Sequence, residues 1–173
     1  MRRSPKSRGS ASSDPPDAFT TALTLLGQRE LSESQIRDRL ARRGCQPADI
    51  DAAVARLRAD RTLDDARVAR AAARLEAAIR GRGPARVRQR LRALGLAPDV
   101  VQDALADTFA EVDQDALLEQ ALDRRLGARS LADLDDKARA RLARGLIGQG
   151  FAPALVLARV REKGRGRAIQ NDE

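Results

Sequence analysis

The feature that most constrains the fold of this chain is an internal repeat with a period of 51 to 55 residues. Three copies align on Gly44, Gly95 and Gly150, and six positions around each glycine carry matching residues. These register positions lie eight and four residues before the glycine and one, three, six and ten residues after it. In chain order they are occupied by Ile36, Leu40, Cys45, Pro47, Ile50 and Val54, then Val87, Leu91, Leu96, Pro98, Val101 and Leu105, then Leu142, Leu146, Phe151, Pro153, Val156 and Val160. Repetition of this period is typical of stacked helical units.

Each copy predicts two helices joined by a short turn. The apolar residues before the glycine are four apart and form the buried stripe of one helix, and those after the proline form the stripe of the next. The glycine suits the left-handed position that ends a helix, and the proline suits the first turn of its successor. A third helix is expected before each pair, at about 18–28, 64–79 and 113–126. The sequence therefore predicts an all-α fold, a tandem array of three three-helix repeats with about nine helices, elongated because each repeat contacts mainly its neighbours.

The same register sets the boundaries of the predicted domains. The three repeats are expected at residues 18–63, 64–112 and 113–163. Residues 1–17 are rich in Ser, Pro and Arg and have almost nothing apolar to bury, which predicts a disordered basic N-terminal arm. Residues 164–173 are expected to form a loose C-terminal tail.

The missing residue types exclude most kinds of catalytic site. The chain has no His, Tyr or Trp and one cysteine, which excludes a disulfide within the chain and a Cys/His zinc site. It also lacks a phosphate-binding loop motif. The acid pairs Asp64–Asp65 and Asp135–Asp136 could ligate Mg²⁺, but each stands where a helix is expected to begin, and capping is the favoured interpretation. We therefore expect no catalytic residue, no metal and no cofactor.

The sequence also carries no sign of a membrane or export signal. No segment approaches the roughly 18 apolar residues that a membrane span requires. The N-terminus lacks the apolar stretch of a signal peptide. We expect a cytoplasmic protein without a membrane partner.

Positive charge is concentrated on one helix of each repeat. The chain has 33 Lys and Arg against 25 Asp and Glu, a net charge of +8, and residues 80–95, "RGRGPARVRQRLRALG", hold six arginines and no acid. Arginine binds phosphate and carboxylate groups through two parallel hydrogen bonds, so these helices predict a row of contacts to DNA phosphates or to an acidic protein surface. The candidate contacts are Arg80, Arg82, Arg86, Arg88, Arg90, Arg92, Arg37, Arg39, Arg42, Arg43, Arg139, Arg141 and Arg144.

The abundance of arginine could also arise without a binding partner, in two ways. Acids on the following helix, Asp99, Asp103 and Asp107, could pair with these arginines inside the array, and the excess of Arg over Lys could reflect a GC-rich genome. The chain has only three aromatic residues, all Phe, so stacking of single-stranded bases is disfavoured. Contact with a nucleic-acid backbone, or with a protein–DNA assembly, is better supported than base reading.

Three segments together resemble the regulatory protein RecX family. The stretch "LSESQIRDRLARRG" is similar to the family's "S..EL...L...G", and "TLDDARVAR", residues 62–70, is similar to its "LDD.RFA". The stretch "RGPARVRQRLRALGL", residues 82–96, is similar to its "G..RI..EL...GI". The resemblance covers residues 18–111 and, less closely, extends to about 163. This chain departs from the pattern at Val68, where the family usually has an aromatic residue, and at Gln89, where it often has an acid.

The resemblance implies a fold and a function. RecX proteins are tandem three-helix repeats that bind the RecA recombinase and its filament on DNA and need no known catalytic residue. They inhibit the ATPase and recombination activities of RecA, and so modulate homologous recombination and the SOS response of DNA repair. Some bind DNA directly; for this chain we expect weak binding with little sequence selectivity, and a monomer. The alternative is a stand-alone DNA-binding regulator of the helix-turn-helix type, since helix pairs joined by a glycine-containing turn occur in that motif.

Overall fold

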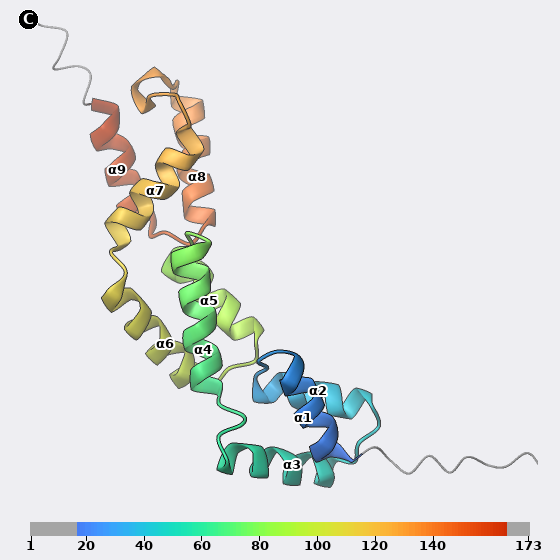
Figure 1. Ribbon diagram of the computed structural model, residues 1–173. Coiled ribbons are helices and arrows are strands. Elements are labelled where there is room, and N and C mark those ends of the chain that lie inside the picture. Colours follow the sequence, from blue (N-terminus) through green and yellow to red (C-terminus); the bar gives the residue numbers. More distant parts are fainter. Residues whose placement is uncertain (1–16, 166–173) are drawn as a thin grey trace, which may run out of the picture. The chain divides into compact units, whose positions relative to one another are not determined.

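The computed structural model describes residues 17–165 (Figure 1). Nearly all of the predicted N-terminal arm and the tail from residue 166 lie outside the described residues. The part of the chain that is described contains helices and no strand, which confirms the all-α prediction. None of its helices is long and apolar enough to cross a membrane. Its α-helices are α1 (Ala18–Gln28), α2 (Glu33–Arg42), α3 (Pro47–Ala59), α4 (Asp65–Arg74), α5 (Pro84–Ala93), α6 (Pro98–Glu111), α7 (Gln114–Leu126), α8 (Asp136–Gly148) and α9 (Pro153–Arg165).

Two short helices of other types complete the described chain. The π-helix η1 (Leu75–Ile79) continues α4, and the 3₁₀-helix η2 (Leu131–Asp133) lies between α7 and α8. Both interrupt the regular α-helical pattern close to a turn. Each presents a backbone carbonyl to an arginine, since Glu76 accepts from the N–H of Arg82 and Leu131 accepts from the side chain of Arg139.

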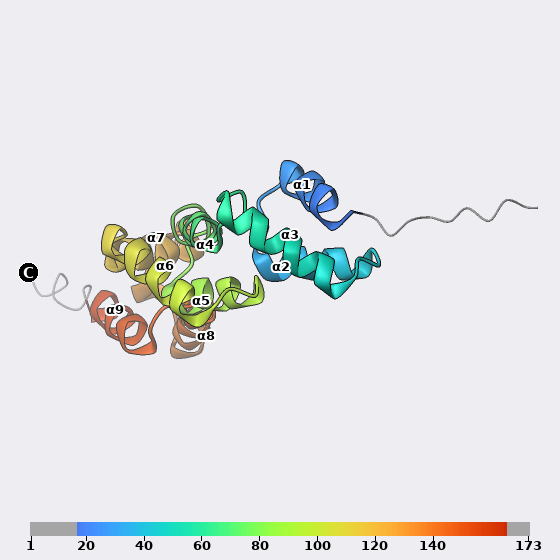
Figure 2. The same ribbon diagram turned by 90° about the horizontal axis from the view of Figure 1, so that it is seen from below.

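Three hydrophobic cores follow the predicted repeats. All fifteen apolar register positions are buried, so the residues that align in the sequence have the same role in each repeat. The first core joins α1, α2 and α3, the second joins α4, α5 and α6, and the third joins α7, α8 and α9. The packing of α4 and α5 against α6 can be followed from below in Figure 2. The tandem three-helix prediction is confirmed, whereas the elongation of the array and the bounds of the repeats stay predictions.

The register glycines and prolines occupy the predicted places at helix ends. Gly44, Gly95 and Gly150 have φ angles of 83°, 74° and 99°, in the left-handed region that favours glycine, and each lies just beyond the end of a helix. A proline opens the following helix in each repeat, α3, α6 and α9. The turn between the last two helices of a repeat is therefore built the same way three times.

The acid pairs cap helices, as expected. The backbone N–H of Arg67 donates to the carboxylate of Asp64 at 2.9 Å, and that of Ala138 donates to Asp135 at 2.7 Å. Each carboxylate thereby satisfies a backbone donor that has no partner within its helix. Among the described residues there is no cluster of three metal-ligating side chains.

The chain divides into two compact units. One comprises the first repeat up to Leu63 without residues 32–34, and the other comprises residues 32–34 with everything from Asp64 onward. Within the second unit, two repeats meet through their backbones. The N–H groups of Gly83 and Ala85, at the start of α5, donate to the carbonyls of Gln149 and Gly150 at 3.0 and 3.1 Å. A Cβ on Gly83 would overlap the carbonyl group of Gly150, so glycine permits this approach.

The same kind of contact recurs elsewhere in the second unit. The hydroxyl of Ser32 donates to the carbonyl of Leu94. Ser32 and Gly83 both stand twelve residues before a register glycine, and the accepting residues Leu94 and Gln149 both stand one residue before the next. The two hydrogen bonds thus have equivalent positions in the repeat register, although the donor is a side chain in one case and a backbone amide in the other.

Candidate functional site: an arginine-lined cavity

Four arginines of the basic segment, residues 80–95, surround a cavity between η1 and α5. We call it the arginine cavity; its volume is about 390 Å³. Four arginines and one acid give its lining a net charge of +3, and its one apolar side chain is a single alanine. The lining residues are Glu76, Arg80, Arg82, Arg86, Gln89, Arg90 and Ala93.

The acid of this cavity, Glu76, is buried and holds two of the arginines. Its Oε1 accepts a hydrogen bond from Nη1 of Arg80 at 2.7 Å and lies 3.8 Å from Nε of Arg90. Only 7% of the Glu76 side chain is exposed, whereas about half of each arginine side chain is. A carboxylate buried under two guanidinium groups restricts their rotamers, and their remaining N–H groups stay available to a ligand.

The π-helix η1 shapes the turn at which these groups meet. The N–H of Arg80 donates to the carbonyl of Leu75, five residues back, at 3.1 Å, and the N–H of Arg82 donates to the carbonyl of Glu76 at 2.9 Å. The side chain and the backbone of Glu76 thereby hold two arginines that follow it in the chain. Single π-turns within helices occur frequently at functional sites.

The six arginines of residues 80–95 are divided by the structure. Four line the cavity, and one of them, Arg86, donates from Nη1 to Gln89 Oε1 at 2.7 Å. Arg88, half-buried, and Arg92, exposed, lie on the same helix but do not line it. The helix thus carries arginines that share a cavity and others that do not, which makes a matched comparison possible.

The acid that pairs with this segment was missed by reasoning from the sequence. Asp99, Asp103 and Asp107 of α6 were considered as possible partners, but within residues 17–165 the ion pairs of these arginines go to Glu76, on the helical segment before them. A usable signal was present, because Glu76 stands four residues before Arg80 on a helix whose buried face it shares with Ala73.

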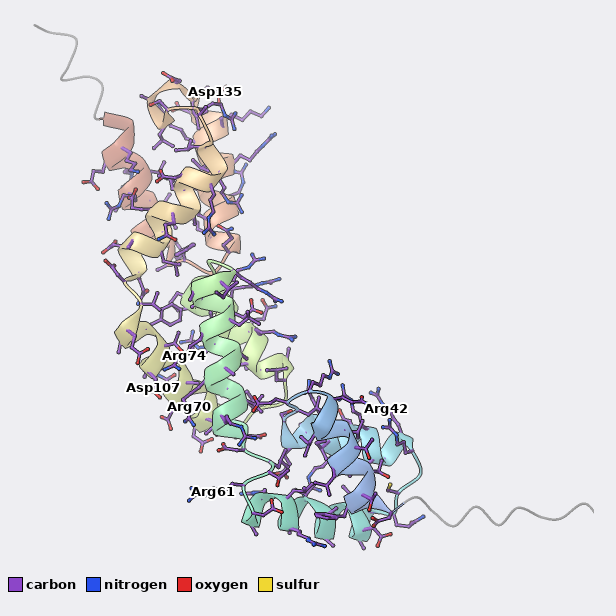
Figure 3. All side chains as sticks on the ribbon, in the orientation of Figure 1. Arg42, Arg61, Arg70, Arg74, Asp107 and Asp135 are labelled. Atoms are coloured by element: carbon purple, nitrogen blue, oxygen red, sulfur yellow. The ribbon has the colours of Figure 1, made fainter. Side chains whose placement is uncertain are left out.

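The arginines predicted in the first repeat have several kinds of partner. Arg37 pairs with Asp51 of α3, and Nη1 of Arg43 lies 3.5 Å from the carbonyl oxygen of Arg39. Arg42, at the end of α2, is exposed (Figure 3). Arg39 is half-buried. These four arginines belong to the first unit and take no part in the arginine cavity.

In the third repeat, Arg139 is engaged by its own repeat. Its Nε and Nη2 donate to the carbonyls of Leu131 and Ala132, at 3.3 and 3.2 Å, and its Nη1 lies 3.5 Å from Asp136. The guanidinium therefore fastens η2 to the start of α8, a stabilising role within the fold. The other two candidates, Arg141 and Arg144, are exposed.

Some arginines outside the candidate set form ion pairs with acids of their own repeat. Arg74 of α4 (Figure 3) lies 3.5 Å from Glu111 of α6. Arg159 of α9 lies 3.1 Å from both Asp115 and Glu119 of α7. Internal pairing thus links helices within a repeat and accounts for some arginines, while those of the arginine cavity share a single acid.

The fold and the cavity define a protein of tandem three-helix repeats with a cationic hollow beside a π-turn. The sequence matches the family descriptions "RecX, first three-helix domain" over residues 18–57 and "RecX, second three-helix domain" over residues 64–105. The chain belongs to the RecX family of regulatory proteins. The prediction made from the three sequence segments is confirmed.

Relatives and solved structures support this assignment. The regulatory protein RecX of Syntrophotalea carbinolica is 35% identical over 141 residues, which cover 81% of this chain and 92% of that protein. The RecX of Halorhodospira halophila is 38% identical over 112 residues, covering 65% and 68% of the two chains. The crystal structure of RecX from Lactobacillus salivarius, at 18% identity, has a TM-score of 0.71 over 84% of this chain and 94% of that one, a likeness in fold.

Proposed function

We propose that this protein is a non-enzymatic regulator that binds RecA and RecA–DNA filaments and lowers their ATPase and recombination activity. It would act in the cytoplasm on homologous recombination and on the SOS response to DNA damage. Membership of a family whose members are named regulatory proteins supports this proposal. The single observation that carries the binding step is the arginine cavity, with four guanidinium groups around one buried acid.

The chemistry of the arginine cavity suits a phosphate. Arg80 and Arg90 form ion pairs with the buried Glu76, and Arg82 and Arg86 complete the lining. A guanidinium group binds two phosphate oxygens at once, and arginines held in position lose less conformational entropy on binding. Contacts to phosphates position a protein on a nucleic acid without reading its sequence. Direct DNA binding should accordingly be weak and weakly sequence-selective.

A RecA ATPase assay with matched variants tests the proposal. Wild-type protein titrated into RecA on single-stranded DNA should lower the rate of ATP hydrolysis. The double variant Arg86→Gln/Arg90→Gln should need about tenfold more protein for the same inhibition, since it removes two lining guanidinium groups. The control Arg88→Gln/Arg92→Gln removes two positive charges from the same helix, but outside the cavity. The amount of this variant needed for the same inhibition should stay within about twofold of wild type.

Two results would contradict the proposal. Wild-type protein that leaves the ATPase rate flat at excess, together with tight sequence-selective duplex binding, would favour the helix-turn-helix regulator instead. Equal losses in the two double variants, at matched thermal stability, would show that total charge rather than the arginine cavity carries the binding.

A further inference from the structure

A second basic cavity, of about 470 Å³, lies in the third repeat where α7 ends and α8 begins. We call it the leucine cavity, because three leucines contribute to its lining. Its volume falls in the range of about 300–1,000 Å³ that is usual for ligand sites. The lining residues are Arg125, Leu126, Arg129, Leu134, Asp135, Lys137, Ala138, Arg141 and Leu142.

The apolar part of this cavity distinguishes it from the arginine cavity. Leu126 and Leu142 are nearly buried, with 8% and 9% of their surface exposed, and Leu134 is half-buried. All three belong to the third hydrophobic core or pack against it, so the cavity opens onto the edge of that core. An apolar side chain placed there would remove leucine surface from water.

The cations of the leucine cavity are of two kinds. Arg125 is engaged within the fold, because its Nε donates to Gln149 Oε1 at 3.3 Å and its Nη2 to the carbonyl of Gly145 at 3.2 Å. Arg129, Lys137 and Arg141 are exposed, and within residues 17–165 their side chains form no hydrogen bond or ion pair. In this part of the chain, three cations therefore lie beside the leucines without an ion-pair partner.

The acid of the leucine cavity does not neutralise them. Asp135, at the start of α8 (Figure 3), accepts the N–H of Ala138 at 2.7 Å and so caps its helix. Its Oδ1 is engaged by this backbone N–H, and no ion pair joins the carboxylate to a cation among the residues that the structure describes. The cavity thus presents positive charge that its own acid leaves unpaired, next to an apolar surface.

We infer that the leucine cavity binds an acidic segment of a protein partner, with an aliphatic or aromatic side chain against the leucines and carboxylates on Arg129, Lys137 and Arg141. An interface anchored by one apolar side chain in a pocket, with charges at its rim, is a common form of recognition. A nucleic-acid backbone would leave the leucines unfilled, and the cavity has no aromatic side chain on which a base could stack. The inference rests on the proposed function, in which the partner is a protein bound to DNA.

A peptide titration tests the chemistry of the cavity without RecA. The probe is an acetylated octapeptide of six acidic residues around a central Phe-Leu pair, added to full-length protein labelled with ¹³C in its leucine methyl groups. The methyl signals of Leu126, Leu134 and Leu142 should shift, and a control peptide with Ala-Ala in the centre should shift them much less. Unshifted leucine signals at millimolar peptide would overturn the inference.

Charge reversal with a matched control locates the binding. In the variant Lys137→Glu/Arg141→Glu the peptide-induced shifts should disappear, because the carboxylates of the peptide then meet like charges. The control Arg144→Glu/Arg161→Glu makes the same charge change at exposed residues of α8 and α9 outside the cavity, and should keep the shifts. Loss in both variants would assign the effect to net charge and overturn the inference.

The same variants separate this inference from the proposed function. On RecA filaments, the cavity variant should bind about tenfold more weakly than the control variant, while both bind free single-stranded DNA alike. A selective loss of affinity for free DNA would make the leucine cavity a nucleic-acid site and overturn the inference. If the peptide shifts the leucine methyl signals of wild-type protein but that protein fails to bind RecA, the proposed function is contradicted. The chemistry of the cavity is then still supported.

Discussion

The arginine cavity and the leucine cavity carry the same net charge but differ in how their acid interacts with their cations. Each has four cationic side chains and one acid, a net of +3. In the arginine cavity the acid is buried and fixes two guanidinium groups. In the leucine cavity the acid caps a helix, and the side chains of three of the four cations form no hydrogen bond or ion pair within the described residues. The comparison teaches that net charge does not define a site, because the place of the acid decides which cations are prearranged.

The surfaces around the charges differ as well. The arginine cavity has no apolar side chain larger than alanine, and the leucine cavity borders the third hydrophobic core. A hydrated phosphate suits the first, and a carboxylate beside a hydrocarbon side chain suits the second. The two cavities of the second unit thus suit ligands of different chemistry.

The largest effect is expected at a glycine that adjoins the arginine cavity. In Gly83→Ala the new Cβ meets the backbone of Gly150, which has no flexible end that could move away. The φ angle of Gly83 is −73°, which alanine adopts freely, so the cost comes from contact alone. The substitution should lower the free energy of unfolding by about 1–3 kcal/mol, measured by urea denaturation.

Gly145→Ala is the matched control beside the leucine cavity. There the new Cβ meets the guanidinium of Arg125, the far end of a flexible side chain that can turn aside. The gain of about 1 kcal/mol in helix propensity should offset the hydrogen bond that is lost, giving a change near zero. Equal destabilisation by the two substitutions would contradict the view that backbone contact makes Gly83 irreplaceable.

A smaller effect is expected from neutralising the acid of each cavity. Glu76→Gln removes the charge that holds Arg80 and Arg90, and should lower the free energy of unfolding by about 1–2 kcal/mol. It should also tighten binding to single-stranded DNA, since the lining then carries a net of +4. Asp135→Asn keeps a capping oxygen at α8 and should leave both stability and DNA binding almost unchanged. Weaker DNA binding by Glu76→Gln would show that orientation of the arginines outweighs their charge.

The smallest effect concerns the caps, and it depends on pH. The hydrogen bond from the Arg67 N–H lowers the pKa of Asp64 below its ordinary value of 3.8. The ionised cap therefore stabilises the fold above that value, and its contribution is lost as the pH falls through the lowered pKa. Asp64→Ala should cost about 1 kcal/mol at neutral pH, and the difference from wild type should shrink as the pH falls below 3.8.

Urea denaturation at several pH values measures the stability cost of Asp64→Ala. The substitution Asp135→Ala, in the leucine cavity, serves as the comparison. Both substitutions remove a helix cap, so their costs at neutral pH should be similar. Only Asp135→Ala should strengthen binding of the acidic octapeptide, because only Asp135 lines the leucine cavity. A pH-independent cost of Asp64→Ala would contradict a role for its charge.

The sequence by itself determined the helices, the cores and the family. The spacing of Ile36 and Leu40, repeated around Gly95 and Gly150, predicted which residues are buried, because helical periodicity and burial are local consequences of residue order. The caps at Asp64 and Asp135 were predictable for the same reason. Their partners lie within three residues along the chain.

The tertiary structure alone decided which charges meet. Glu76 reaches Arg90 only because α5 folds back beside η1, and Arg125 reaches Gly145 only because α7 packs on α8. The approach of Gly83 to Gly150 joins residues that a helical pattern treats as unrelated ends of helices. Such contacts depend on side-chain rotamers and on how helices pack, neither of which is contained in the periodicity of the sequence. For this reason the thirteen candidate arginines have different places in the fold. Four of them line the arginine cavity, Arg141 lines the leucine cavity, and Arg37 and Arg139 pair with acids of their own repeat.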